Sequence, residues 1–280
     1  MRAAAAASAG DRDRAPSGFW SRILVVAALL PAVLGLVWLG GWWVLGLAAV
    51  AGAIALHEYF GMIRELRPLA LAGFAGFVLT LLGVQLGGLD WMLAGFTATF
   101  GLAFLLHLVA RTRSSPTVAV ASTVMGAGWI GLGLGYLVLL RGIADHGHLA
   151  AFTVLIAVWA ADSAAYLVGR LIGRHRLAPV LSPGKTWEGF VAGSAAAVFI
   201  AFVALYRTGF VDGWRSIVLG FTIALSAALG DLFESALKRD VGVKDSGSLL
   251  AGHGGMLDRI DAILFAGIAS YYVIRAFGAA

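Results

Sequence analysis

Long apolar runs dominate the chain, and short polar stretches separate them. A helix needs about 20 mostly apolar residues to cross the hydrocarbon core of a membrane. The pattern predicts spans near 23–39, 42–63, 69–88, 91–110, 118–140, 149–170, 190–206, 216–237 and 262–277. We therefore expect an all-α integral membrane protein, a polytopic helical bundle of about nine transmembrane helices.

Basic residues are distributed very unevenly over the connections between these spans. If the spans alternate in direction, sixteen of the 20 lysines and arginines fall on one side, together with the N-terminus. Cytoplasmic loops carry such an excess, so the N-terminus is expected in the cytoplasm. We expect residues 1–22 to form a disordered cytoplasmic tail and 23–280 a single transmembrane domain, with its catalytic motifs in 162–261.

Composition narrows the class further. The chain is 60% hydrophobic and 12% charged, whereas soluble domains carry about 25% charged residues. It contains no cysteine, which excludes disulfides and thiolate metal sites. The net charge of +5 is spread between spans and does not indicate nucleic-acid binding. The arginine- and alanine-rich composition is typical of a GC-rich bacterial genome, and we therefore expect the protein in a bacterial inner membrane.

Ionisable residues inside spans need a partner or a function, because burying each costs about 2.5–3.5 kcal/mol on insertion scales. Asp162, Tyr166 and Arg170 are spaced i, i+4, i+8 and share one helix face. They form either a structural Asp–Arg pair or part of a site. His57 and Glu58 lie near the cytoplasmic end of the second span, where we expect snorkelling or helix–helix bonding rather than catalysis.

The polar stretch "LSPGKTWEGF" precedes the seventh span. Ser182, Pro183 and Gly184 are turn residues, and Thr186 and Glu188 could cap the helix that follows. Lys185 would then lie beside a helix N-terminus, a position that already favours anions. An ordinary cytoplasmic turn is the structural alternative.

Carboxylates gather around the last polar connection. Asp231, Glu234 and Lys238 share one helix face, with Asp231 about 10 Å inward of Lys238. Asp258 and Asp261 open the last span, directly after a glycine-rich run. Oxygen ligands without cysteine favour a hard cation such as Mg²⁺ over zinc. The predicted metal ligands are Asp231, Glu234, Asp258 and Asp261.

The stretch from Ser235 to Asp261, "SALKRDVGVKDSGSLLAGHGGMLDRID", resembles the signature of the phosphatidate cytidylyltransferase (CDP-diacylglycerol synthase) family. "SPGKTWEG" and "DSAAYLVGRLIGR" are similar to two further stretches of that family, in the same order. Ala251 departs from the signature, which has proline or glycine there. The first 150 residues resemble the family only in being apolar spans.

The resemblance implies the Mg²⁺-dependent conversion of CTP and phosphatidate, a lipid, into CDP-diacylglycerol and pyrophosphate. It implies that basic residues neutralise phosphates, namely Lys185, Lys238, Arg239, Lys244 and Arg259. It further implies substrate contacts from Ser182, Thr186, Asp162, Tyr166, Asp245, His253, Gly254 and Gly255. A homodimer is implied by the resemblance alone, and a second, monovalent cation is left open.

A different lipid enzyme and a transporter are the two alternatives to this function. A CDP-alcohol phosphotransferase would carry a longer aspartate motif, of which "DGWRS" at 212–216 is only a fragment on the wrong side. A cation or lipid transporter would place polar residues in both halves of the membrane. Here they collect in the cytoplasmic half, which favours an enzyme.

Overall fold

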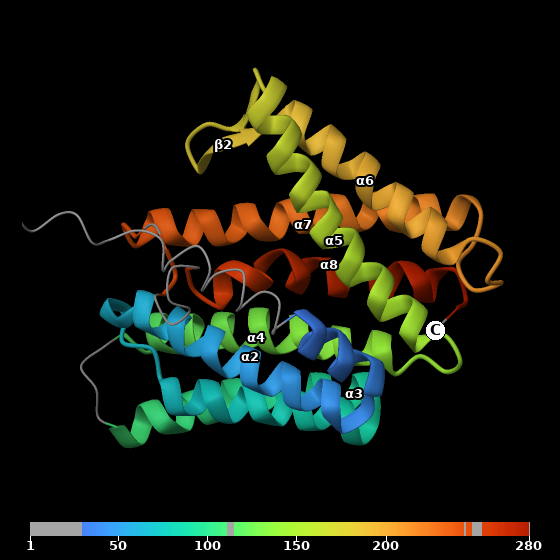
Figure 1. Ribbon diagram of the computed structural model, residues 1–280. Helices are drawn as coiled ribbons and strands as arrows, with labels where there is room; N and C mark the ends of the chain where they lie inside the picture. The colour runs from blue at the N-terminus through green and yellow to red at the C-terminus, as the bar shows by residue number, and fades with distance from the viewer. Residues whose placement is uncertain (1–29, 111–114, 244, 248–253, 280) are drawn as a thin grey trace, which may run out of the picture.

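The computed structural model describes residues 30–110, 115–243, 245–247 and 254–279 (Figure 1). Long helices account for most of them: Leu30–Leu39, α2 (Gly41–Met62), α3 (Ala70–Ala110), α4 (Pro116–Arg141), α5 (Gly147–Ile172), α6 (Trp187–Leu205), α7 (Trp214–Asp240) and α8 (Leu257–Ala276). A short 3₁₀ turn, Arg64–Leu66, follows α2. The predicted tail, 1–22, lies outside the described residues, as do Lys244 and His253.

Six of the helices in the described ranges, α2 to α7, are long and apolar enough to cross a membrane. Helix Leu30–Leu39 is shorter, and the first turns of α8 carry Asp258, Arg259 and Asp261. Large apolar side chains on the outer faces remain exposed, among them Leu71 (71%) and Val109 (79%). An apolar exterior of this extent is typical of a lipid-facing surface. The prediction of a helical membrane protein is confirmed at this level.

Helix α3 contains a sharp break that matches the predicted boundary between spans 69–88 and 91–110. Gly87 and Gly88 have non-helical backbone angles, and Gly88 adopts φ 68°. A side chain at Gly83 would collide with the backbone carbonyl of Trp91 in the second arm. The two arms therefore double back on each other, and glycine permits both the turn and the close approach.

The helices form three tiers (Figure 1). Helices α2, α3 and α4 make the first tier, α7 and α8 lie side by side in the middle, and α6 forms the third together with α5, which packs on α6 and runs obliquely across α7 and α8. One hydrophobic core runs through the bundle, with Leu56, Ile130, Leu219 and Leu264 fully buried. The middle tier contacts both of the others, so the carboxylates of α7 and α8 lie at the centre of one end.

A two-stranded antiparallel hairpin connects α5 to α6: β1 (Arg176–Ala178) and β2 (Ser182–Thr186). The predicted turn at Ser182–Gly184 is therefore wrong, since these residues lie in β2 and the turn precedes them at 179–181. Proline is tolerated in a two-stranded ribbon because every strand is an edge strand. The hairpin adds a small strand element to the predicted all-α fold.

Candidate functional site

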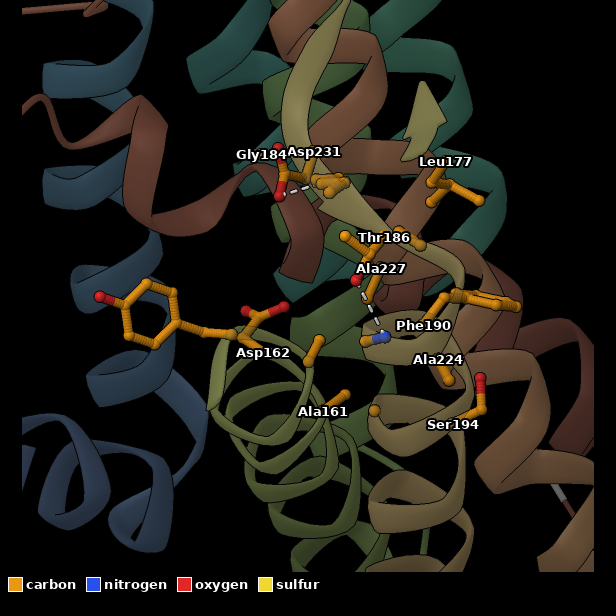
Figure 2. Close-up of a pocket in the computed structure, with 16 residues that line it drawn as sticks. Ala161, Asp162, Leu177, Gly184, Thr186, Phe190, Ser194, Ala224, Ala227 and Asp231 are labelled. Atoms are coloured by element: carbon orange, nitrogen blue, oxygen red, sulfur yellow. Dashed lines mark hydrogen bonds and ion pairs between the residues drawn. The ribbon is translucent and has the colours of Figure 1, made fainter. Parts of the chain in front are cut away.

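A cavity of about 340 Å³ opens between α5, α6, α7 and the β1–β2 hairpin (Figure 2). Its polar lining residues are Asp162, Tyr166, Lys185, Thr186, Ser194 and Asp231. Alanine, glycine, leucine and phenylalanine side chains make up the rest. Figure 2 shows Asp231 beside Gly184 at one end and Ser194 with Ala224 at the other. The cavity therefore combines a charged end with a largely apolar wall.

The charged end is an ion pair between two sequence motifs that lie far apart in the chain. The ammonium nitrogen of Lys185, on β2, lies 2.6 Å from Oδ2 of Asp231, on α7. The hydroxyl of Ser235, one turn further along α7, donates to Oδ1 of Asp231 at 3.4 Å. Both charged side chains are partly accessible from the cavity. A phosphate group of a ligand could replace the Asp231 carboxylate as the partner of the Lys185 ammonium group.

Local capping chemistry holds Lys185 in place. Thr186 is the N-cap of α6, and its hydroxyl accepts the backbone N–H of Gly189 at 3.1 Å, as predicted. The Glu188 carboxylate accepts the backbone N–H of His175 and pairs with its imidazole at 2.7 Å. These bonds attach both ends of the hairpin to the first turn of α6, so Lys185 is anchored from both sides.

Helix α5 supplies Asp162 and Tyr166 to the cavity wall. Arg170 donates to the hydroxyl of Tyr166 at 2.9 Å. The described part of the chain therefore does not contain the alternative, a structural Asp162–Arg170 pair. Gly169 allows α5 to approach the start of α6 closely, because a side chain there would lie 2.9 Å from the hydroxyl oxygen of Thr186. Glycine at this position therefore permits the two helices to pack closely.

A second charged group lies where α7 ends and α8 begins, and we call Glu234, Lys238 and Asp258 the α7–α8 cluster. The ammonium nitrogen of Lys238 lies 2.9 Å from Glu234 Oε2 and 2.6 Å from Asp258 Oδ1. Asp258 Oδ2 accepts the Gly255 N–H at 2.8 Å and the Ser246 hydroxyl at 2.9 Å. Lys238 thus links two helices that belong to one sequence motif.

Glu234 is the most deeply buried carboxylate of this cluster, with 1% of its surface exposed. Its Oε2 accepts from Lys238, but its Oε1 has no hydrogen-bond partner within the described ranges. A buried acceptor without a donor is costly, and a bound cation would satisfy it. Oxygen donors with no cysteine in the chain also fit a hard divalent cation such as Mg²⁺.

The carboxylates do not by themselves define a metal site. In the parts of the chain that the structure covers, no three Asp, Glu or His residues are arranged to hold a metal ion. Lys185 and Lys238 pair with Asp231 and Asp258 instead. Asp261 is buried (6% exposed), and Gly230 of α7 packs against its backbone carbonyl. The Mg²⁺ ligands therefore stay a prediction.

The remaining predicted site residues are less closely tied to these groups. Arg239 is exposed and donates from Nε to the carbonyl of Leu181 at 3.4 Å, next to Ser182 in the hairpin. Asp245 and Arg259 are exposed. Gly254 adopts φ 78°, a conformation that favours glycine at this position of the motif.

The contacts of two residues beside the site, Ser246 and Glu58, were not predicted from the sequence. Ser246 has no ionisable group and lies among the charged residues of the motif, and Glu58 is 188 positions away on α2. Glu58 is buried and bonds to the start of α8. Of the two predicted possibilities, snorkelling and helix–helix bonding, the structure shows helix–helix bonding for Glu58. The one signal in the sequence was the insertion cost of a carboxylate within a span.

Fold and site together define a class: a polytopic helical membrane protein with lysine–carboxylate groups clustered at one end, beside a largely apolar cavity. Within that class the chain belongs to the cytidylyltransferase family, whose model matches residues 20–277. The match includes both charged groups and all the helices that surround them.

Individual relatives agree with this membership. The phosphatidate cytidylyltransferase of Staphylococcus haemolyticus is 32% identical over 248 residues, which cover 87% of this chain and 92% of the relative. The protein of the same name from Brucella suis biovar 1 is 34% identical over 263 residues, 91% of this chain and 93% of the relative. That from Mycobacterium leprae is 34% identical over 262 residues, 83% and 79% of the two chains.

Proposed function

We propose that the protein transfers the cytidylyl group of CTP to phosphatidate, producing CDP-diacylglycerol and pyrophosphate for phospholipid biosynthesis. Family membership and the names of its relatives support this reaction. The observation that carries it is the juxtaposition of a lysine–carboxylate pair with a cavity that is otherwise largely apolar. A phospholipid headgroup next to its acyl chains has the same division into charged and apolar parts.

The chemistry is a displacement at the α-phosphorus of CTP. A phosphate oxygen of phosphatidate forms a bond to that phosphorus, and the bond to the bridging oxygen of the β-phosphate breaks, so pyrophosphate leaves with the electron pair. The attacking oxygen is already anionic at neutral pH, so no strong general base is required. Catalysis then depends on positioning and on stabilising negative charge.

The basic residues divide between two tasks in this proposal. Lys185 would bind the lipid phosphate at the head of the cavity, because its ammonium group is partly accessible there. Lys238 would neutralise phosphate charge at the α7–α8 cluster, together with Arg239 of the same helix end. A compact ammonium acts as a point charge toward phosphate.

Mg²⁺ is the proposed cofactor, held by Asp231, Glu234, Asp258 and Asp261. The unpaired oxygen of buried Glu234 and the oxygen-only donor set support it. When bound, such an ion polarises phosphoryl oxygens and neutralises the leaving pyrophosphate. When substrate phosphates pair with the ammonium groups of Lys185 and Lys238, Asp231 and Asp258 would become available to bind the ion.

We further propose nine membrane spans with the N-terminus and the site on the cytoplasmic side of a bacterial inner membrane. The excess of basic residues around the site's connections supports this orientation. CTP would then reach the site from the cytosol, and phosphatidate would enter from the inner leaflet. A homodimer is part of the proposal through family resemblance only.

Purified protein in mild detergent tests the reaction directly. With phosphatidate, CTP and Mg²⁺, we expect pyrophosphate release matched by CDP-diacylglycerol, and no release with EDTA. Asp258→Asn should abolish turnover, because it weakens the bonds from Lys238 and the turn before α8. Asp240→Asn is the matched control, since it alters an exposed carboxylate at the end of α7 and should leave turnover unchanged.

Failure would take distinct forms. Folded, lipid-supplied wild-type protein that releases no pyrophosphate would contradict the proposed reaction. Turnover that persists in EDTA would contradict the metal while leaving the reaction intact. Near-normal turnover in Asp258→Asn would remove Asp258 from the catalytic group.

A further inference from the structure

Glu58 joins the first tier of helices to the glycine turn that opens α8. Its Oε1 accepts the backbone N–H of Met256 at 3.0 Å, and its Oε2 accepts that of Leu257 at 2.9 Å. These are N–H groups at the start of a helix, which have no partner within the helix. A carboxylate there also interacts favourably with the helix dipole. Glu58 therefore caps α8 from a different helix.

The turn is shaped around this carboxylate. Side chains at Gly247 or Gly255 would collide with the Glu58 side chain. Glu58 itself is 5% exposed and Gly255 is buried. Because both glycines give the backbone room to close over the carboxylate, the fit is specific to this pairing. The Glu58 side chain on α2 thus explains why glycine occupies these two positions of the motif.

The same turn holds Asp258. Its Oδ2 accepts the N–H of Gly255, the residue before the first of the two that bond Glu58. The Ser246 hydroxyl lies within bonding distance of both carboxylates, 2.9 Å from Asp258 and 3.4 Å from Glu58. Displacing the turn would therefore shift Asp258, and with it the ion pair to Lys238.

We propose that Glu58 is a positioning residue for the cytidylyl transfer, which fixes the glycine turn and thereby Asp258 and Lys238. The expected effect on turnover rests on the proposed function, whereas the contact between Glu58 and the turn does not. Glu58 does not line the cavity, and its hydrogen bonds in the described ranges go to the turn and to Ser246, so its effect passes through them.

Glu58→Gln is the informative change, because it preserves side-chain size and replaces one acceptor oxygen with an NH₂ donor. One of two buried backbone N–H groups then faces another donor. Tyr59→Phe is the matched control: it removes a buried hydrogen bond of the neighbouring residue, to the carbonyl of Ser122 on α4. Ser246→Ala is a milder second variant, which removes only the shared hydroxyl.

The first readout is amide hydrogen exchange of peptides covering 254–258 in folded protein. Glu58→Gln should speed exchange there by about tenfold, the effect of losing one strong hydrogen bond to a charged group. Tyr59→Phe should leave these peptides unchanged. Equal protection in wild type and Glu58→Gln would overturn the proposal, whatever the protein's activity. If Glu58→Gln does not fold, Ser246→Ala tests the link between the two carboxylates, and unchanged exchange and unchanged kcat in that variant would overturn the proposal.

The second readout is turnover per folded molecule. A displaced turn should lower kcat by about 10- to 100-fold, as small misplacements of catalytic groups do, with the KM for CTP little changed. A residue that only stabilised the fold would lower the melting temperature and leave kcat of the folded fraction unchanged, as expected for Tyr59→Phe. A wild-type protein without turnover would count against the proposed function alone, and the exchange result would still decide the role of Glu58.

Discussion

Lys185 is the charged residue that the hairpin contributes to the cavity lining, and its charge can be tested separately from the fold. Lys185→Ala removes the only basic side chain among the cavity's lining residues in the described ranges. We expect kcat/KM for phosphatidate to fall by about 100-fold, the effect of losing one preorganised charge at a reacting phosphate. The melting temperature should change little, since partly exposed ion pairs contribute about 0–1 kcal/mol.

Arg176→Ala provides the comparison, because it removes an exposed basic residue from the same hairpin and leaves the cavity lining intact. Kinetics of the two variants with phosphatidate in mixed micelles would separate a specific contact from general attraction of an anionic lipid. If both variants lose activity equally, Lys185 acts only through net charge. If Lys185→Ala loses stability but not activity, its pair with Asp231 is structural.

Individual residues were predicted well where one helix carries the whole pattern. The spacing of Asp231, Glu234 and Lys238 places them on one face of α7, and Lys238 does bond Glu234. Glu58 was noted in the sequence, but its partners were not predicted, because they are backbone N–H groups almost 200 positions away and leave no pattern in the sequence. The sequence left the partner of Arg170 open, because the same helical spacing serves Asp162 and Tyr166, and the structure shows a hydrogen bond to Tyr166.

Among the elements, the start of α6 determines where the hairpin ends. Thr186→Ala removes the N-cap bond to Gly189 and should destabilise the protein by about 1 kcal/mol. For a chain of this size that corresponds to a melting temperature lower by about 2–4 °C. Thr186→Ser keeps the hydroxyl and should retain wild-type stability. Thermal unfolding of the detergent-solubilised variants measures both.

If Thr186→Ser is as unstable as Thr186→Ala, packing of the methyl group against Gly173 matters more than the cap. Activity adds a second distinction. Since the hydroxyl is already bonded to Gly189, its predicted contact with substrate requires that bond to be shared. Loss of activity in Thr186→Ala without loss of stability would favour the substrate contact.

Helices were predictable as elements because an apolar run long enough to span a membrane has few other ways to satisfy its backbone. The predicted spans from 42 onward each overlap a described helix or, in α3, one arm of a broken one, and the first is described only as helix Leu30–Leu39. The β1–β2 hairpin was missed because its strands are only 3 and 5 residues long and contain proline and glycine. Tertiary contacts with α6, not strand propensity, stabilise it.

Over the whole molecule, the three motifs meet because α5, α6, α7 and α8 bring their polar ends to one side of the bundle. Asp231 and Glu234 lie one turn apart on α7, so the cavity and the α7–α8 cluster share a helix. This convergence depends on how the helices pack, which the order of motifs in the sequence does not specify. It gives the membrane orientation a functional consequence, because only one face can receive CTP.

The orientation can be tested with two cysteines, since the chain has none of its own. Gly184, in β2, has no atom near enough to obstruct a side chain, and Ala144 is exposed at the opposite end of α5. The 26 residues of α5 separate these ends by about 39 Å. In intact cells a membrane-impermeant maleimide should label Ala144→Cys alone, and permeabilised cells should show labelling of both.

The distribution of basic residues determines the expected orientation. The loops on the Gly184 side carry most of the lysines and arginines, and such loops are retained in the cytoplasm. The cysteine-free parent controls for background labelling, and Arg176→Ala in the Gly184→Cys protein controls for local charge at the reacting thiol. Labelling of Gly184→Cys in intact cells would invert the topology and place the site on the outer face, where CTP is absent. Such a result would contradict the orientation and remove the proposed route by which the nucleotide reaches Lys238.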